Sequence, residues 1–191
     1  MKNHHHIFRR AVHIFGLQAT TVYYLIPDNV FISQFDKNYA MLICLICVIE
    51  FEYIRITKNW QIPGFRPYER YRFSALLWAA LGLFICYLMC PYYIGAPLVL
   101  CAAWVDPLMG ELRARNFHNP NIVGFASYFM ILLISLLYLA PLPLNKILVI
   151  SGVGSTVGTV CEAKKNYYLD DNFLMLVCPA VTIMFLLKFL P

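Results

Sequence analysis

The chain has 191 residues, of which 61% are hydrophobic and only 13% are charged, and its formal net charge is +5. Soluble domains carry about 25% charged residues. This composition therefore excludes a soluble globular protein and predicts an all-α integral membrane protein that forms a single domain over residues 1–191. We expect the protein to lie in a lipid bilayer and to bind no nucleic acid. Composition does not distinguish a monomer from a homodimer.

Seven apolar stretches approach the roughly 20 residues that a helix needs to cross a bilayer. They cover residues 12–27, 39–56, 74–90, 92–109, 122–140, 144–161 and 173–190. With a cytoplasmic N-terminus, all lysines and arginines except Lys37, Lys146 and Lys188 fall on the cytoplasmic side, as the positive-inside rule requires. We therefore predict a bundle of about seven transmembrane helices with the N-terminus in the cytoplasm and the C-terminus outside. Such a multi-pass protein would lie in the plasma or inner membrane of a prokaryote, or in the endoplasmic reticulum of a eukaryote.

The seven cysteines lie in or beside these apolar stretches. We interpret them as small buried hydrophobic residues and not as disulfide partners.

Most acidic residues fall on the cytoplasmic side as well, although acids contribute little to orientation. Asp106 lies near the end of the fourth stretch, Glu162 ends the sixth, and Asp170, Asp171 and Asn172 precede the seventh. An aspartate at a helix end can be solvated, and Asp or Asn can cap a helix N-terminus. Capping needs only one residue, however, and several carboxylates together are typical of hard oxygen ligands for a cation such as Mg²⁺.

Gly154 and Gly158 in the sixth stretch have two interpretations. They can form a small-residue face for close helix packing, or their exposed amides can approach a phosphate.

Basic side chains on the same side also have two interpretations. They can bind phosphate, or they can reflect only orientation and contact with anionic lipid headgroups. The pool consists of Arg9, Arg10, His13, Arg55, Arg66, Arg70, Arg72, Arg113, Arg115, Lys164 and Lys165. Acids and arginines on one side of a membrane, without a Ser-His-Asp, HExxH or thiol–imidazole set, favour metal-assisted phosphoryl chemistry.

Four stretches resemble the CTP-dependent lipid-alcohol kinases, a family that includes dolichol kinase, phytol kinase and a diacylglycerol kinase and that is related to the phosphatidate cytidylyltransferases. The stretches are Phe-Arg-Arg-Ala-Val-His-Ile-Phe-Gly at 8–16, Arg-Pro-Tyr-Glu-Arg-Tyr-Arg-Phe-Ser-Ala at 66–75, Trp-Val-Asp-Pro-Leu-Met-Gly at 104–110, and Glu162 with Leu-Asp-Asp-Asn-Phe at 169–173. The family usually has Lys-Ser-x-x-Gly after the third of these, whereas residues 118–124 here lack the lysine and the serine. Another cation, such as Arg113 or Arg115, would then supply the charge, or the specificity of this chain differs.

The resemblance implies Mg²⁺-dependent transfer of a phosphate from CTP to the hydroxyl of a polyprenol, a phytol-like prenol or diacylglycerol at the cytoplasmic face. The implied catalytic residues are Asp106, Glu162 and Asp171, and the implied metal ligands are Asp106, Asp170 and Asp171. The residues implied to bind the nucleotide phosphates are Arg10, His13, Arg70, Gly110, Arg113, Lys165 and Asn172. The alternatives are a cytidylyltransferase that makes a CDP-activated lipid from a lipid phosphate, and a non-catalytic membrane protein of the same fold.

Overall fold

The computed structural model describes the backbone of residues 2–26, 37–60, 62, 65, 67–164 and 169–189, and the side chains of all of these except 2–9, 12, 37–38 and 67–68. This part of the chain contains seven α-helices, one short 3₁₀ helix and no strand. The elements are α1 (Lys2–Leu25), α2 (Lys37–Thr57), η2 (Pro67–Tyr71), α3 (Ala75–Met89), α4 (Tyr92–Ala114), α5 (Pro120–Leu139), α6 (Leu144–Ala163) and α7 (Asp171–Phe189).

Each of the seven apolar stretches forms a helix, so the all-helical prediction is confirmed. Four of the helices, α4 to α7, are long and apolar enough to cross a membrane. The other three helices are too short or too polar by the same criterion. Helix α3 is apolar but has 15 residues, the first half of α1 is polar, and α2 carries Glu50, Glu52 and Arg55.

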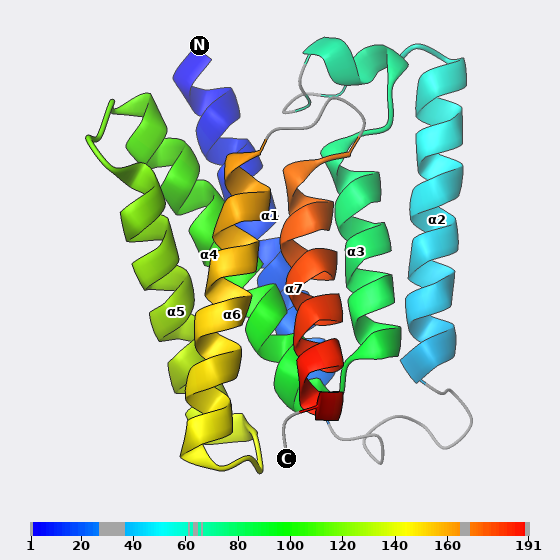
Figure 1. The fold of residues 1–191 in the computed structure, drawn as a ribbon. Coiled ribbons are helices and arrows are strands. Elements are labelled where there is room, and N and C mark those ends of the chain that lie inside the picture. Colours follow the sequence, from blue (N-terminus) through cyan, green and yellow to red (C-terminus); the bar gives the residue numbers. More distant parts are fainter. Residues whose placement is uncertain are drawn as a thin grey trace.

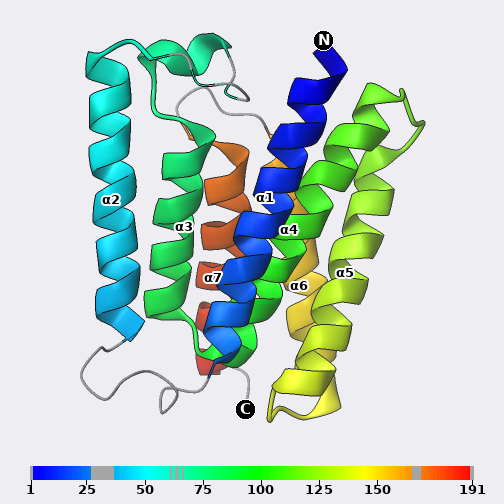
Figure 2. The same cartoon turned by 180° about the vertical axis from the view of Figure 1, so that it is seen from behind.

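The helices run alternately up and down, and α4 and α7 lie at the centre of the bundle (Figures 1 and 2). Helix α4 packs against α1, α5 and α7, and α7 packs against α3 and α6 as well, whereas α2 lies at one edge against α3. Helices α2, α4 and α6 end, and α3, α5 and α7 begin, at the end of the bundle where α1 begins, and α7 ends at the opposite end (Figure 1). This topology gathers the polar connections at one end, which we call the N-terminal end.

The core between α4, α5, α6 and α7 is formed by fully buried side chains such as Tyr128, Leu132, Ile150 and Ile183. Three cysteines belong to the interior as predicted, namely Cys86, Cys90 and Cys101. The prediction of burial is wrong for Cys44 and Cys47, which are exposed, because α2 lies at the edge of the bundle and packs mainly on α3. Cys161 and Cys178 are half-buried.

The glycines of α6 are explained by close packing. A Cβ atom added to Gly158 would lie 2.5 Å from Cε2 of Tyr128, and one added to Gly154 would lie 2.9 Å from methyl groups of Leu132 and Ile183. The Tyr128 ring is completely buried, and its hydroxyl donates a hydrogen bond to the Met175 carbonyl oxygen at 3.3 Å, so the ring cannot move aside easily. Of the two interpretations left open by the sequence, the structure supports helix packing.

This packing predicts opposite effects for two glycines of the same helix. Gly152 has no atom within 4 Å of an added Cβ, so Gly152→Ala should leave stability unchanged or raise it, because alanine is the better helix former. Gly158→Ala should be less stable than Gly152→Ala by about 1–3 kcal/mol, because the methyl group overpacks the contact with Tyr128. Thermal unfolding of both variants in one detergent measures the difference, and equal stabilities would contradict the packing described here.

Candidate functional site

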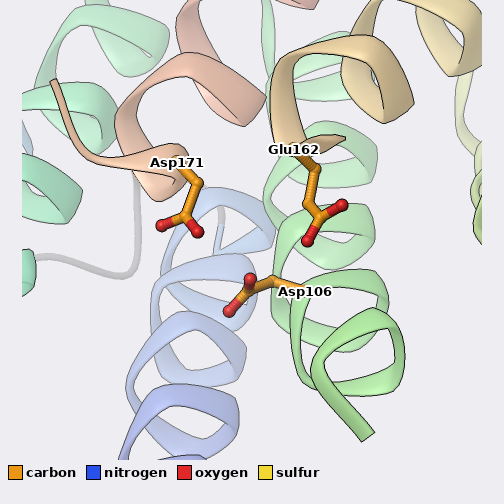
Figure 3. Close-up of side chains that lie close together, drawn as sticks. All are labelled: Asp106, Glu162 and Asp171. Atoms are coloured by element: carbon orange, nitrogen blue, oxygen red, sulfur yellow. The ribbon is translucent and has the colours of Figure 1, made fainter. Parts of the chain in front are cut away.

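Three carboxylates from three helices converge at the N-terminal end of the bundle. They belong to Asp106 in α4, to Glu162 near the end of α6, and to Asp171 at the start of α7, and one oxygen of each lies within 4.8 Å of the others. Figure 3 shows the three side chains pointing toward a common space. Because α6 and α7 are antiparallel neighbours, the last turn of one and the first turn of the other meet there. We call these residues the carboxylate cluster.

Basic groups lie directly beside the cluster. Arg113 donates from both terminal nitrogens to the two oxygens of Glu162, at 2.5 Å each, and the Glu162 side chain is only 2% exposed. Nε2 of His13 lies 3.7 Å from a carboxylate oxygen of Asp106 and 3.4 Å from the Ala102 carbonyl oxygen. Since a carbonyl oxygen can only accept, the contact with Ala102 places a hydrogen on Nε2. One guanidinium thus neutralises Glu162, and Nε2 of the His13 imidazole lies near Asp106.

The arrangement fits a small hard cation. Like charges at this separation repel each other unless a cation lies near them, and Arg113 is paired with Glu162. Carboxylate oxygens are the protein ligands that Mg²⁺ prefers, usually one or two of them together with water and substrate phosphate. Because both oxygens of Glu162 are already bound by Arg113, Asp106 and Asp171 are the pair best suited to hold such an ion.

The structure places Asp170 outside the carboxylate cluster, although the sequence includes it among the metal ligands. Its Oδ1 accepts hydrogen bonds from the backbone N–H of Asn172 at 3.1 Å and from the Asn172 side-chain amide at 2.7 Å. Asp170 thus satisfies free donors at the beginning of α7, as a helix-capping carboxylate does. Asp171, the next residue, is the one that turns toward Asp106 and Glu162 (Figure 3).

The remaining predicted phosphate-binding residues lie in different places. Arg10 of α1 forms an ion pair with Glu111, and a Cβ added to Gly110 would lie 4.0 Å from Nη2 of Arg10. Gly110 follows Asp106 by one helical turn, so Arg10 lies over the face of α4 that carries Asp106. Arg70 lies on η2 beside the ring of Tyr71, and its buried Nε has no partner among the described residues. Lys165 lies outside the described residues.

An apolar cavity of 370 Å³ adjoins this region between α1, α2 and α3. Its polar end is formed by His13, Asn172, Glu69 and Ser74. Its walls and floor are apolar or small, and they include Leu17, Met41, Leu45, Ala75, Ala79, Ala80 and Leu83. No sequence pattern located this cavity, because each of the three helices contributes only a few of its residues.

A buried ion pair fixes the segment at the polar end of the cavity. The Arg55 side chain, 1% exposed, donates to Glu52 at 2.5 and 3.1 Å and to the backbone carbonyls of Glu69 and Arg72 at 2.6 Å each. Glu52 in turn accepts from the backbone N–H of Ser74 at 2.9 Å. The only signal in the sequence was the spacing of Glu52 and Arg55, three residues apart on one helix, which lets the two side chains meet.

Comparison of the chain with family models, with curated proteins and with solved structures gives no match.

Proposed function

We propose that the protein transfers the terminal phosphoryl group of a nucleoside triphosphate to the hydroxyl of a membrane lipid alcohol in a Mg²⁺-dependent reaction. The carboxylate cluster carries this proposal, because it joins acids from three helices at one end of a bundle with four helices of membrane length. Catalysis of phosphoryl transfer consists largely of positioning and charge stabilisation, which acids with a bound cation and arginines supply. The resemblance of the sequence to the lipid-alcohol kinases favours CTP as the donor.

The reaction joins the alcohol oxygen to the terminal phosphorus, while the bond from that phosphorus to its bridging oxygen breaks and the nucleoside diphosphate leaves. Asp106 and Asp171 would hold Mg²⁺, which neutralises charge on the phosphate oxygens when it is bound. The hydroxyl proton passes to Asp171, since a carboxylate has two oxygens and can accept with one while the other serves the ion. Glu162 is less suited to take a proton, because Arg113 binds both of its oxygens.

The basic residues around the cluster would bind the triphosphate. Nε2 of His13 lies 3.7 Å from Asp106, and Arg10 of α1 lies over the face of α4 near Gly110, one turn beyond Asp106. Arg10 and Arg115 share Glu111, so an incoming phosphate can exchange with that carboxylate. Arg113, and by the resemblance Arg70 and Lys165, complete the proposed set of cations that replaces the family's missing Lys-Ser pair.

We also propose that α1, α2 and α3 lie in the bilayer with the other four helices, as a seven-span protein with a cytoplasmic N-terminus. The charges of Glu52 and Arg55 are paired inside the protein, and the outer face of α2 presents Leu42, Ile43 and Ile46. Lysine and arginine gather at the N-terminal end of the bundle, which the positive-inside rule places in the cytoplasm. The carboxylate cluster would then face the compartment that contains nucleotides.

The proposal is tested with purified protein, Mg²⁺, labelled CTP and a panel of prenols, diacylglycerol and phosphatidic acid. Label at the γ-phosphate should appear in a lipid product and label at the α-phosphate should not, and chelation of Mg²⁺ should abolish the reaction. Transfer of the α-label to phosphatidic acid, with release of pyrophosphate, would instead identify a cytidylyltransferase. No labelled lipid from any substrate and any nucleoside triphosphate would contradict the enzymatic proposal and favour a non-catalytic protein.

A further inference from the structure

We propose that the cavity between α1, α2 and α3 binds the acceptor, and that this acceptor is an alcohol with a single apolar chain whose hydroxyl donates to Oδ1 of Asn172. The phosphorylation of that alcohol rests on the proposed function, whereas the binding site itself rests on the cavity and on Asn172. A prenol meets this description, and diacylglycerol, with two chains, does not.

The first observation is an unpartnered acceptor on Asn172, a residue that lines the cavity. Asn172 is 3% exposed, and its Oδ1 has no hydrogen-bond partner among the described residues. The orientation of the amide is fixed, because its nitrogen donates to Asp170 at 2.7 Å and a carboxylate can only accept. A buried acceptor without a donor costs free energy. A ligand with a hydroxyl group at this position would satisfy it.

This atom gives Asn172 a role beside the one that the sequence predicts. The sequence includes Asn172 among the residues that bind the nucleotide phosphates. Phosphate oxygens need donors, and the Asn172 amide has two N–H groups, of which the bond to Asp170 uses one, so the phosphate contact stays a prediction. Oδ1 is an acceptor, which suits the O–H of an alcohol and not a phosphate.

The second observation is the size and character of the cavity. Its volume of 370 Å³ lies within the range of small-molecule sites, roughly 300–1,000 Å³. A cavity of this size accommodates the part of one apolar chain that follows the hydroxyl. Ala79 and Ala80 of α3 and Leu17 of α1 give the chain an apolar lining.

The third observation is the position of the cavity between the bilayer and the carboxylate cluster. Helices α1 and α2 lie on either side of α3 (Figure 2), and α1 packs mainly on α4 while α2 packs on α3. Cys44 of α2 and Leu76 of α3 line the cavity and are exposed, so the cavity is open to the surroundings. At the other end, His13 lines the cavity and also lies 3.7 Å from Asp106, and Asn172 adjoins Asp171 in the chain. The cavity thus comes close to the carboxylate cluster at His13.

Binding is measured without nucleotide, with the 191-residue chain in nanodiscs. A fluorescent prenol is bound first, and each ligand is compared by how well it displaces this probe. Farnesol should displace the probe better than farnesene, the corresponding hydrocarbon, and better than dioctanoylglycerol. Asn172→Ala should weaken farnesol binding about tenfold, the value of one hydrogen bond to a buried acceptor, and should leave farnesene binding unchanged. A purely structural role of Asn172 would weaken both ligands equally, and that result would overturn the assignment.

The chain lining is tested with substitutions that fill the cavity. Ala79→Leu and the milder Ala80→Val should each weaken farnesol binding at least fivefold, whereas Ala126→Leu, on an exposed position of α5, should not change it. Unchanged binding in the cavity variants, or equal displacement by dioctanoylglycerol and farnesol, would overturn the inference. If the cavity variants phosphorylate prenols with an unchanged KM for the prenol, the cavity is not the acceptor site. That result would overturn this inference and leave the proposed function standing. The expected binding pattern without any phosphorylated product would contradict the proposed function alone.

Discussion

Asp171→Asn is expected to lower the rate of phosphoryl transfer by about 100- to 10,000-fold, the usual contribution of a positioned general base. The substitution keeps the size and shape of the side chain but removes its charge and its ability to take a proton. It also removes one of the two carboxylates proposed to hold Mg²⁺, so the Mg²⁺ concentration that gives half-maximal activity should rise. Both effects are measured from the initial rate of lipid phosphorylation over a series of Mg²⁺ concentrations.

The matched control for this experiment is Glu50→Gln. It makes the same change of charge on the exposed side of α2, away from the carboxylate cluster, and should leave the rate and the Mg²⁺ dependence unchanged. Asp170→Asn separates the two neighbouring acids further. Because Asp170 holds the amide of Asn172, its loss should raise the KM for the alcohol more than it lowers kcat. Full activity of Asp171→Asn would exclude the proposed role of Asp171.

Arg55→Met should destabilise the protein by about 3–5 kcal/mol, the range observed when one partner of a buried ion pair is removed. The variant leaves the carboxylate of Glu52 buried without its cation, and it leaves the backbone carbonyls of Glu69 and Arg72 without the guanidinium that they accept from. The loss should appear as a lower midpoint in thermal or denaturant unfolding. Because Glu69 lines the cavity, farnesol binding should weaken as well.

Arg115→Met provides the comparison, because Arg115 also pairs with a glutamate on its own helix. Its side chain is 76% exposed, whereas that of Arg55 is 1% exposed. Exposed ion pairs contribute about 1 kcal/mol or less, so Arg115→Met should unfold close to the wild-type midpoint. If the two variants lose similar stability, burial of the Glu52–Arg55 pair does not have the effect argued here. The double variant Glu52→Gln with Arg55→Met should be more stable than Arg55→Met alone, since it removes the uncompensated charge.

The sequence was most informative where long apolar stretches decide the local structure. Every such stretch became a helix, because backbone groups in an apolar environment must bond within their own segment. The apolar pattern did not show how far each helix continues beyond its apolar stretch into polar residues. Residues 92–109 were predicted for the fourth helix, yet α4 continues to Ala114, and this extra turn carries Arg113 to Glu162.

The sequence predicted which types of residue form the site, but it identified only some of the individual residues. Asp106, Glu162 and Asp171 were identified because acids are costly beside apolar stretches and because their motifs resemble those of a kinase family. Asp170 could not be distinguished from Asp171 in the sequence, since both precede the last apolar stretch. Only the direction of the first turn of α7 decides that Asp171 faces the cluster while Asp170 caps the helix.

The sequence by itself therefore determined the helical architecture, the gathering of charge on the side of the N-terminus and the kinds of group available for chemistry. These properties depend on composition and on local apolar length. The tertiary structure alone decided that Gly158 packs on Tyr128, that three acids from separate helices form one cluster, and that Asn172, with its unpartnered side-chain oxygen, lines an apolar cavity. The physical reason is that these features depend on the rotation and spacing of packed helices, which side chains far apart in the sequence settle together.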